Sequence, residues 1–130
     1  MRLYLVRHAE AAPGEPDELR ALTPEGRRQA RELAQRLHAE GVEPDAILTS
    51  PLLRARETGD AIADATGVEA QPDERLAPGA TEQDVRDAVA GRGDTVVVIG
   101  HQPDCGRIAA ALGGGEEPRF PAAGCVALDL

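Results

Sequence analysis

Histidine and arginine side chains follow three apolar runs of this 130-residue sequence. Arg7 and His8 come directly after the first run. Arg54 lies a few residues after the second, and His101 follows the third, which is the most strongly apolar. If these runs are parallel strands of one sheet, their carboxyl ends meet at one edge, which is where ligands bind in open α/β sheets. Two of the three histidines and two arginines are then predicted to lie together.

A cluster of this kind can hold a phosphoryl group, because guanidinium groups bind its oxygens through paired hydrogen bonds while a nucleophile attacks the phosphorus. Imidazole is the available nucleophile, since its ordinary pKa of about 6.5 leaves it largely neutral at neutral pH. A phosphorus–nitrogen bond to histidine is labile enough for water to cleave it in a second step. The pattern therefore predicts phosphoryl transfer through a histidine.

Each of these residues also has an ordinary structural interpretation. His8 could be a core histidine at a strand end, and His101 a turn residue before a helix. Arg54 could simply pair with Glu57 or Asp60, since acidic side chains are abundant in the sequence. The spatial arrangement of the three segments decides between the two interpretations.

The apolar positions alternate between the period of a strand and that of a helix, which is typical of strands and helices around a largely parallel sheet. Strands are predicted over residues 2–6, 46–49, 68–71, 95–99 and 124–130. Helices are predicted over residues 24–39, 51–66 and 81–90, and from 103 to the glycines at 113–115. We expect one three-layer α/β domain over residues 1–130, with a mainly parallel central sheet flanked by helices.

Local signals mark the predicted helix ends. Thr23 and Pro24 open the first helix as its N-cap and first residue, and Gly41 ends it. Thr81 opens the third helix as the start of a capping box. Arginines and glutamates alternate along the first helix, which predicts a solvated face with His38 on its polar side.

The composition excludes several classes of function. All 14 basic residues are arginine, and without lysine there is no Walker A loop and no Schiff-base lysine. Ser50 is the only serine, so there is no Gly-x-Ser-x-Gly nucleophile elbow. With 23 acidic residues and a net charge of -9, nucleic acid and acidic membranes are not expected as partners.

Neither a membrane segment nor a metal site is expected. The first apolar run is too short for a secretory segment, and no run reaches the length of about 18 residues needed to span a bilayer, so we expect a cytoplasmic enzyme. Cys105 and Cys125 are interpreted as buried thiols without a disulfide. His8 and Glu10 could begin a zinc deaminase signature, but no Pro-Cys-x-x-Cys follows, so no metal and no other cofactor is expected.

The sequence resembles the histidine phosphatase superfamily, which includes the phosphoglycerate mutases. The resemblance lies in three motifs that occur in order at predicted strand ends: LVRH (5–8), SPLLRARET (50–58) and VIGH (98–101). The segment DELRALTPEG (17–26) and the short length are most similar to the small SixA-type phosphohistidine phosphatases. The resemblance implies the fold of phosphoglycerate mutase, which agrees with the predicted elements.

The resemblance also implies roles for the clustered residues. His8 is the implied nucleophile, which forms a phosphohistidine intermediate. Arg7, Arg54 and His101 are implied to hold the phosphoryl oxygens, with Arg20 as a further phosphate contact.

The sequence departs from the mutase-like members at the general acid. They carry a glutamate just after a leucine in the loop before the middle helix, whereas Leu76 is followed here by Ala77. SixA-type members resemble this sequence in lacking that acid. If a general acid exists, the carboxylates to consider are Glu74, Asp17 and Glu10.

Three functions fit these observations. The favoured one is a phosphatase that removes the phosphoryl group from phosphohistidine on a signalling or phosphotransfer protein. The second is a phosphomonoesterase for a small phosphorylated metabolite, and the third is a non-catalytic module that binds phosphate or phosphohistidine. The complete set of Arg7, His8, Arg54 and His101 argues against the third, because a binding module needs no nucleophile. The oligomeric state is left open, and a monomer is compatible with the sequence.

Overall fold

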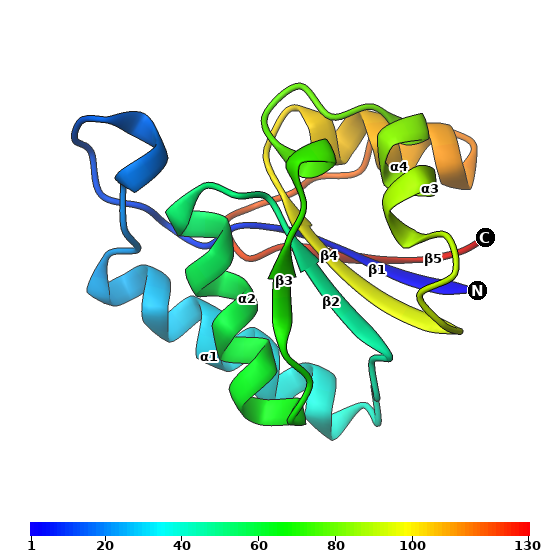
Figure 1. Ribbon diagram of the computed structural model, residues 1–130, viewed down its shortest axis with the longest axis horizontal. Helices are drawn as coiled ribbons and strands as arrows, with labels where there is room; N and C mark the ends of the chain where they lie inside the picture. The colour runs from blue at the N-terminus through cyan, green and yellow to red at the C-terminus, as the bar shows by residue number, and fades with distance from the viewer.

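A five-stranded sheet lies between two layers of helices in the computed structural model, which describes residues 1–130 (Figure 1). The strands are β1 (Arg2–Arg7), β2 (Ala46–Thr49), β3 (Ala70–Pro72), β4 (Thr95–Gly100) and β5 (Cys125–Asp129). Their order in the sheet is β3-β2-β4-β1-β5. All neighbours pair in parallel except β1 and β5, which confirms the predicted mainly parallel sheet.

Four α-helices and two short 3-10 turns complete the domain. They are η1 (Asp17–Leu19), α1 (Pro24–Ala39), α2 (Leu53–Thr66), η2 (Glu74–Leu76), α3 (Glu82–Val89) and α4 (Asp104–Gly113). Helices α1 and α2 cover one face of the sheet, and α3 and α4 cover the other (Figure 1). The predicted three-layer α/β architecture is therefore confirmed.

The central strand β4 contributes side chains to the core on both faces of the sheet. Its residues Val97 and Ile99 belong to the cluster under α1 and α2, while Val96 and Val98 belong to the cluster under α3 and α4. Alternate side chains of a strand point to opposite faces, and this strand is covered on both. A continuous β-branched run suits that position.

The predicted helix caps are present. The Thr23 side chain accepts a hydrogen bond from the Gly26 amide, and Thr81 forms a capping box at the start of α3. Gly26 also permits a close contact, since a Cβ atom there would lie 2.0 Å from the carbonyl oxygen of Glu10. The first turn of α1 therefore packs directly against the segment that follows β1 and His8.

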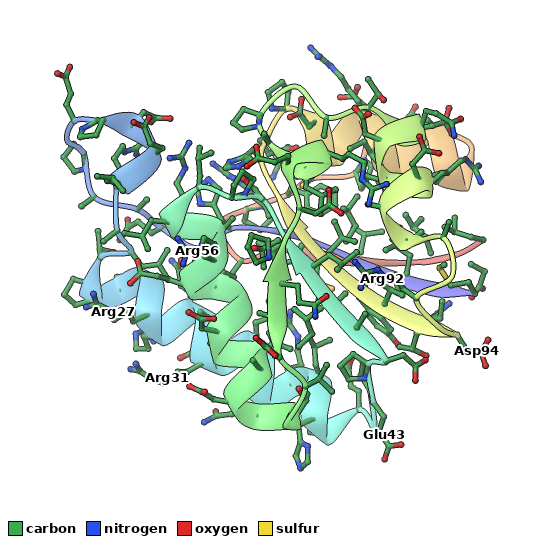
Figure 2. The ribbon with its side chains drawn as sticks, in the orientation of Figure 1. Arg27, Arg31, Glu43, Arg56, Arg92 and Asp94 are labelled. Carbon is green, nitrogen blue, oxygen red and sulfur yellow. The ribbon has the colours of Figure 1, made fainter.

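The solvated face predicted for α1 is observed. Arg27 and Arg31 are exposed and point away from the sheet (Figure 2). His38 is exposed on the same helix, as predicted. None of the helices combines the length and the apolar character that crossing a membrane requires.

Two elements begin two residues later than predicted, and the other predicted boundaries differ by at most one or two residues. The strand expected over 68–71 is observed at Ala70–Pro72, because the Val68 amide donates to Thr66 Oγ1 at the end of α2 instead of to the sheet. The helix expected from residue 51 begins at Leu53, because the Leu52 amide donates to Ser50 Oγ and closes a turn before the helix.

The two cysteines are free thiols, as expected, but only one is fully buried. Cys105 belongs to α4 and is buried in the core, and burial raises its pKa to about 12. Cys125 lies on the edge strand β5 and is partly buried, so the prediction of two buried thiols was wrong for this residue. An edge strand has a neighbour on one side only, which leaves its side chains less covered.

Candidate active site

The carboxyl ends of three adjacent strands, β2, β4 and β1, meet at one edge of the sheet. Ser50 follows β2, His101 follows β4 and His8 follows β1. The rings of His8 and His101 lie with their centroids 5.2 Å apart and their planes inclined by 60°. The structure thus brings together the two histidines that the sequence analysis placed at strand ends.

Hydrogen bonds fix the backbone of His8 from both sides. Its amide donates to the Gly100 carbonyl at 3.0 Å, and its carbonyl accepts from the Ala123 amide at 3.2 Å. The next amide, that of Ala9, donates to the buried Thr58 Oγ1 at 3.0 Å. His8 is therefore held between the end of β4, the segment before β5 and helix α2.

The ring of His8 has one nitrogen free for chemistry. Nδ1 lies 2.7 Å from the carbonyl oxygen of Ala9. A carbonyl oxygen only accepts hydrogen bonds, so Nδ1 carries the proton of the neutral ring and Nε2 keeps its lone pair. This is the tautomer that a nucleophilic Nε2 requires.

The surroundings favour the neutral form of His8. Burial lowers its pKa below the ordinary value, although the hydrogen bond to Ala9 acts in the opposite direction. The positive charges of Arg54, Arg7 and Arg20 lower the pKa further. All three predicted arginines therefore lie close enough to His8 to act on its charge.

His101 is buried, at 5% exposure, and its Nε2 lies 2.7 Å from Ser50 Oγ. Burial, together with the charges of His8 and Arg54, lowers its pKa to about 4, so the ring is neutral at neutral pH. Ser50 Oγ already accepts from the Leu52 amide, and His101 Nε2 is the acceptor available for the hydroxyl proton. The neutral ring of His101 then carries its proton on Nδ1.

Arg54 projects from the first turn of α2 and is only 7% exposed. Its Nη1 donates to the carbonyl oxygen of Asp17 at 2.9 Å, and its Nη2 lies 3.2 Å from Asp17 Oδ2. The alternative that Arg54 pairs with Glu57 or Asp60 was therefore wrong. Glu57 instead accepts a hydrogen bond from the backbone amide of Leu22.

Asp17 joins two arginines. Arg20 Nη1 donates to its Oδ1 at 3.0 Å, while Arg54 holds its Oδ2. The hydrogen bonds from Arg20 and Arg54 lower the pKa of Asp17. Two guanidinium groups thus converge on one carboxylate beside the histidine pair, and that carboxylate is poorly suited to donate a proton.

Arg7 has a donor without a partner. Its Nη1 donates to the carbonyl oxygen of Phe120 at 2.9 Å, whereas its buried Nε has no hydrogen-bond partner. Buried donors in folded proteins are almost always satisfied, by protein, water or ligand. The free donor of Arg7 fits a site that is completed by an anion.

The other carboxylates proposed as general acids are exposed. Glu10 accepts a hydrogen bond from Thr23 Oγ1 at 2.6 Å, and Glu74 lies on the short turn η2. The loop after Leu76 carries no carboxylate, and its Gly79 amide donates to Asp104 Oδ2 at 2.7 Å. No group of His, Cys, Asp and Glu side chains in the structure could hold a metal ion.

Ser50 is the site residue whose role the sequence analysis missed. It was noted as the single serine and as the first residue of the SPLLRARET motif but was given no role, although its place directly after a strand was the signal that could have found one. A cavity of about 430 Å³ lies elsewhere, between α1 and α2, with Leu22, Arg31 and Asp60 in its lining. We place the candidate site at the histidine pair, because the side chains able to bind and attack phosphorus lie there.

Comparison with known proteins gives the family. Residues 3–80 match the model of the histidine phosphatase superfamily (branch 1). The chain belongs to this superfamily. It is a phosphatase of SixA-like type, as the sequence resemblance implied.

Three similar proteins illustrate the relationship. The phosphohistidine phosphatase SixA of Escherichia coli (strain K12) is 32% identical over 129 residues, which cover 91% of this chain and 78% of that protein. An uncharacterised protein of Picosynechococcus is 39% identical over 124 residues, covering 89% and 75% of the two chains. The structure of the protein histidine phosphatase SixA complexed with tungstate superimposes with a TM-score of 0.90 at 28% identity, covering 100% of this chain and 88% of that one.

Proposed function

We propose that residues 1–130 form a histidine phosphatase domain that hydrolyses phosphohistidine on a signalling or phosphotransfer protein. The observation that carries the proposal is the unprotonated Nε2 of His8 in a site lined by arginines. The similarity to SixA phosphohistidine phosphatases supports the substrate class. The reaction proceeds in two steps through a covalent phosphohistidine at His8.

In the first step, the phosphoryl group replaces the Asp17 carboxylate as the partner of Arg54. The free donor of Arg7 and the Nδ1 proton of His101 complete the set of groups that hold its oxygens, with Arg20 at the edge. His8 Nε2 attacks the phosphorus, and the bond from phosphorus to the substrate nitrogen breaks. The substrate imidazole, protonated by solvent on its second nitrogen, departs as a neutral ring and keeps the electron pair of the broken bond on the released nitrogen.

In the second step, water attacks the phosphorus of phosphorylated His8. The phosphorus–nitrogen bond breaks, the electron pair returns to Nε2, and inorganic phosphate leaves. The proton released by water passes to solvent or phosphate. His8 regains its neutral form with the Nδ1 hydrogen bond to Ala9 in place.

Because no general acid lies in position to protonate the leaving group, the site favours substrates whose leaving group is weakly basic. In the substrate-free site the pKa of Asp17 is lowered by its two arginines, and Ala77 stands where the mutase-like members carry their glutamate. An imidazole leaving group has a conjugate acid with a pKa of about 6.5 and needs little help, whereas an alkoxide is comparable to water, at about 15.7. Phosphohistidine is therefore a better substrate than an alkyl phosphate.

A comparison of leaving groups tests this proposal. We expect kcat/KM to fall steeply as the pKa of the leaving group rises across phosphohistidine protein, aryl phosphates and glycerol phosphate. Loss of general acid catalysis typically costs about 10²–10⁴-fold, so glycerol phosphate should be at least about 100-fold slower than phosphohistidine protein. In Ala77→Glu, a carboxyl group at the mutase position should make the dependence less steep. Equal rates for glycerol phosphate and phosphohistidine protein would instead favour a phosphomonoesterase for small metabolites.

The Ser50 hydrogen bond gives a further prediction. Ser50→Ala removes the donor to His101 Nε2, so the ring no longer has a fixed tautomer, and we expect kcat/KM to fall about tenfold, which is the effect of one lost hydrogen bond at a buried group. Nitrogen-15 NMR of the wild type should show His101 protonated at Nδ1. A wild-type ring protonated at Nε2, or a variant with unchanged kcat/KM, would contradict the assigned role of Ser50.

A further inference from the structure

A projecting arm, formed by residues 13–19, stands beside the candidate site. All of its residues are exposed, and it includes the turn η1. Figure 1 shows the arm extending from the body of the protein between β1 and α1, next to the N-terminal end of α2. The fold therefore places a protruding segment at the entrance to the phosphoryl site.

The arm carries the most exposed large apolar side chain of the protein. Leu19 is 63% exposed, whereas the other exposed large apolar residues, Met1 and Leu130, are 37% exposed and lie at the chain ends. Leu19 immediately precedes Arg20 and follows Asp17 by two residues. An isolated exposed leucine carries no information, but this one lies at the edge of a binding site for a protein-borne group.

The arm is held in place by the arginines of the site. Arg54 Nη1 donates to the carbonyl oxygen of Asp17, and Arg20 Nε donates to the carbonyl oxygen of Ala12 at 2.8 Å. The Ala12 amide donates to the Ala21 carbonyl at 2.8 Å, which closes the base of the arm. The backbone that carries Leu19 is thus already ordered, so a partner that binds Leu19 causes little further loss of conformational entropy in the arm.

Carboxylates flank the exposed leucine. Glu15 and Glu18 belong to the arm, are exposed and take part in no ion pair of the structure. A partner that covers Leu19 with apolar side chains would meet these carboxylates at the rim, where basic side chains on the partner would be complementary. A small phosphorylated metabolite bound at His8 has no such surface to offer.

We propose that the arm is the docking element for the substrate protein. Leu19 packs against apolar side chains beside the phosphohistidine of that protein, and Glu15 and Glu18 face its basic side chains. This inference rests on the proposed function and adds to it the surface that recognises the protein carrying the phosphoryl group. The substrate is accordingly a folded phosphoprotein whose phosphohistidine lies on an exposed apolar and basic surface.

The test compares two substrates that share the reacting bond. One is a phosphorylated histidine phosphotransfer domain, chosen from several such domains as the one that the wild type dephosphorylates fastest. The other is the free amino acid phosphohistidine. We expect Leu19→Ser to lower kcat/KM about tenfold for the phosphoprotein, mainly through KM, and to leave the free phosphohistidine rate unchanged. Leu130→Ser, which changes an exposed leucine away from the site, should affect neither substrate.

The possible results distinguish the docking role of the arm from the proposed phosphatase function. A Leu19→Ser variant that hydrolyses the phosphoprotein as fast as the wild type, or that loses activity equally on both substrates, overturns the docking role. A wild type that hydrolyses aryl phosphates but no phosphohistidine substrate overturns the proposed function itself. A loss confined to the phosphoprotein supports both.

Discussion

His8→Ala is expected to abolish hydrolysis of every substrate, phosphoprotein and aryl phosphate alike. His8 Nε2 is the one unprotonated imidazole nitrogen in the site without a partner, since Nδ1 is bound to Ala9 and His101 Nε2 is bound to Ser50. Removing the nucleophile leaves water to attack the substrate directly, without the covalent step. Steady-state assays should give a kcat/KM below detection.

A matched histidine provides the control for this variant. His38 lies on the exposed face of α1, so His38→Ala should retain wild-type activity. Circular dichroism should confirm that both variants are folded, because neither substitution removes a core side chain. Appreciable activity in His8→Ala would show that another group attacks the phosphorus.

Arg54→Ala should give the second largest effect. The guanidinium is buried, donates to the backbone carbonyl and to the carboxylate of Asp17, and lies close enough to lower the pKa of His8. Loss of one preorganised donor to a developing charge costs about 2.7–4 kcal/mol, so kcat/KM should fall about 10²–10³-fold. Inhibition by vanadate or phosphate should weaken as well, because both anions need the same donors.

Arg28→Ala is the control for Arg54. Arg28 is exposed on α1 and pairs with Glu25 and Glu32 on the same helix, and exposed pairs of this kind contribute little. Its removal should leave both kcat/KM and inhibition by phosphate unchanged. If Arg54→Ala behaved like Arg28→Ala, Arg54 would be a structural partner of Asp17 and not a phosphate ligand.

The sequence was sufficient to predict the elements that position the site. The β-branched run of β4, the cap at Thr23 and the capping box at Thr81 are local signals, and each corresponds to the observed structure. Because parallel strands end at one edge, the strand assignments also predict that His8 and His101 lie together. The proximity of the two histidines therefore followed from topology alone.

The contacts between loops could not be predicted in the same way. The alternative weighed for Arg54 was a pair with acidic residues of its own helix, but its acidic partner, Asp17, lies 37 positions away in a turn with no periodic signal. The Ser50–His101 contact likewise joins residues 51 positions apart. Such pairs depend on how turns pack against the folded sheet. Neither the spacing of residues in the sequence nor their secondary-structure propensity predicts that packing.

The most direct test of the account is to trap the phosphorylated enzyme. After brief reaction with a radiolabelled substrate and quenching in denaturant without acid, the protein is digested with trypsin. Cleavage after Arg7 and Arg20 releases residues 8–20, in which His8 is the only histidine and no serine, threonine or tyrosine occurs.

The account predicts that the label resides on this peptide, survives alkali and is lost in acid, as a phosphorus–nitrogen bond requires, and that His8→Ala acquires none. A wild type that turns over without acquiring label, or a label that persists in His8→Ala, would contradict it.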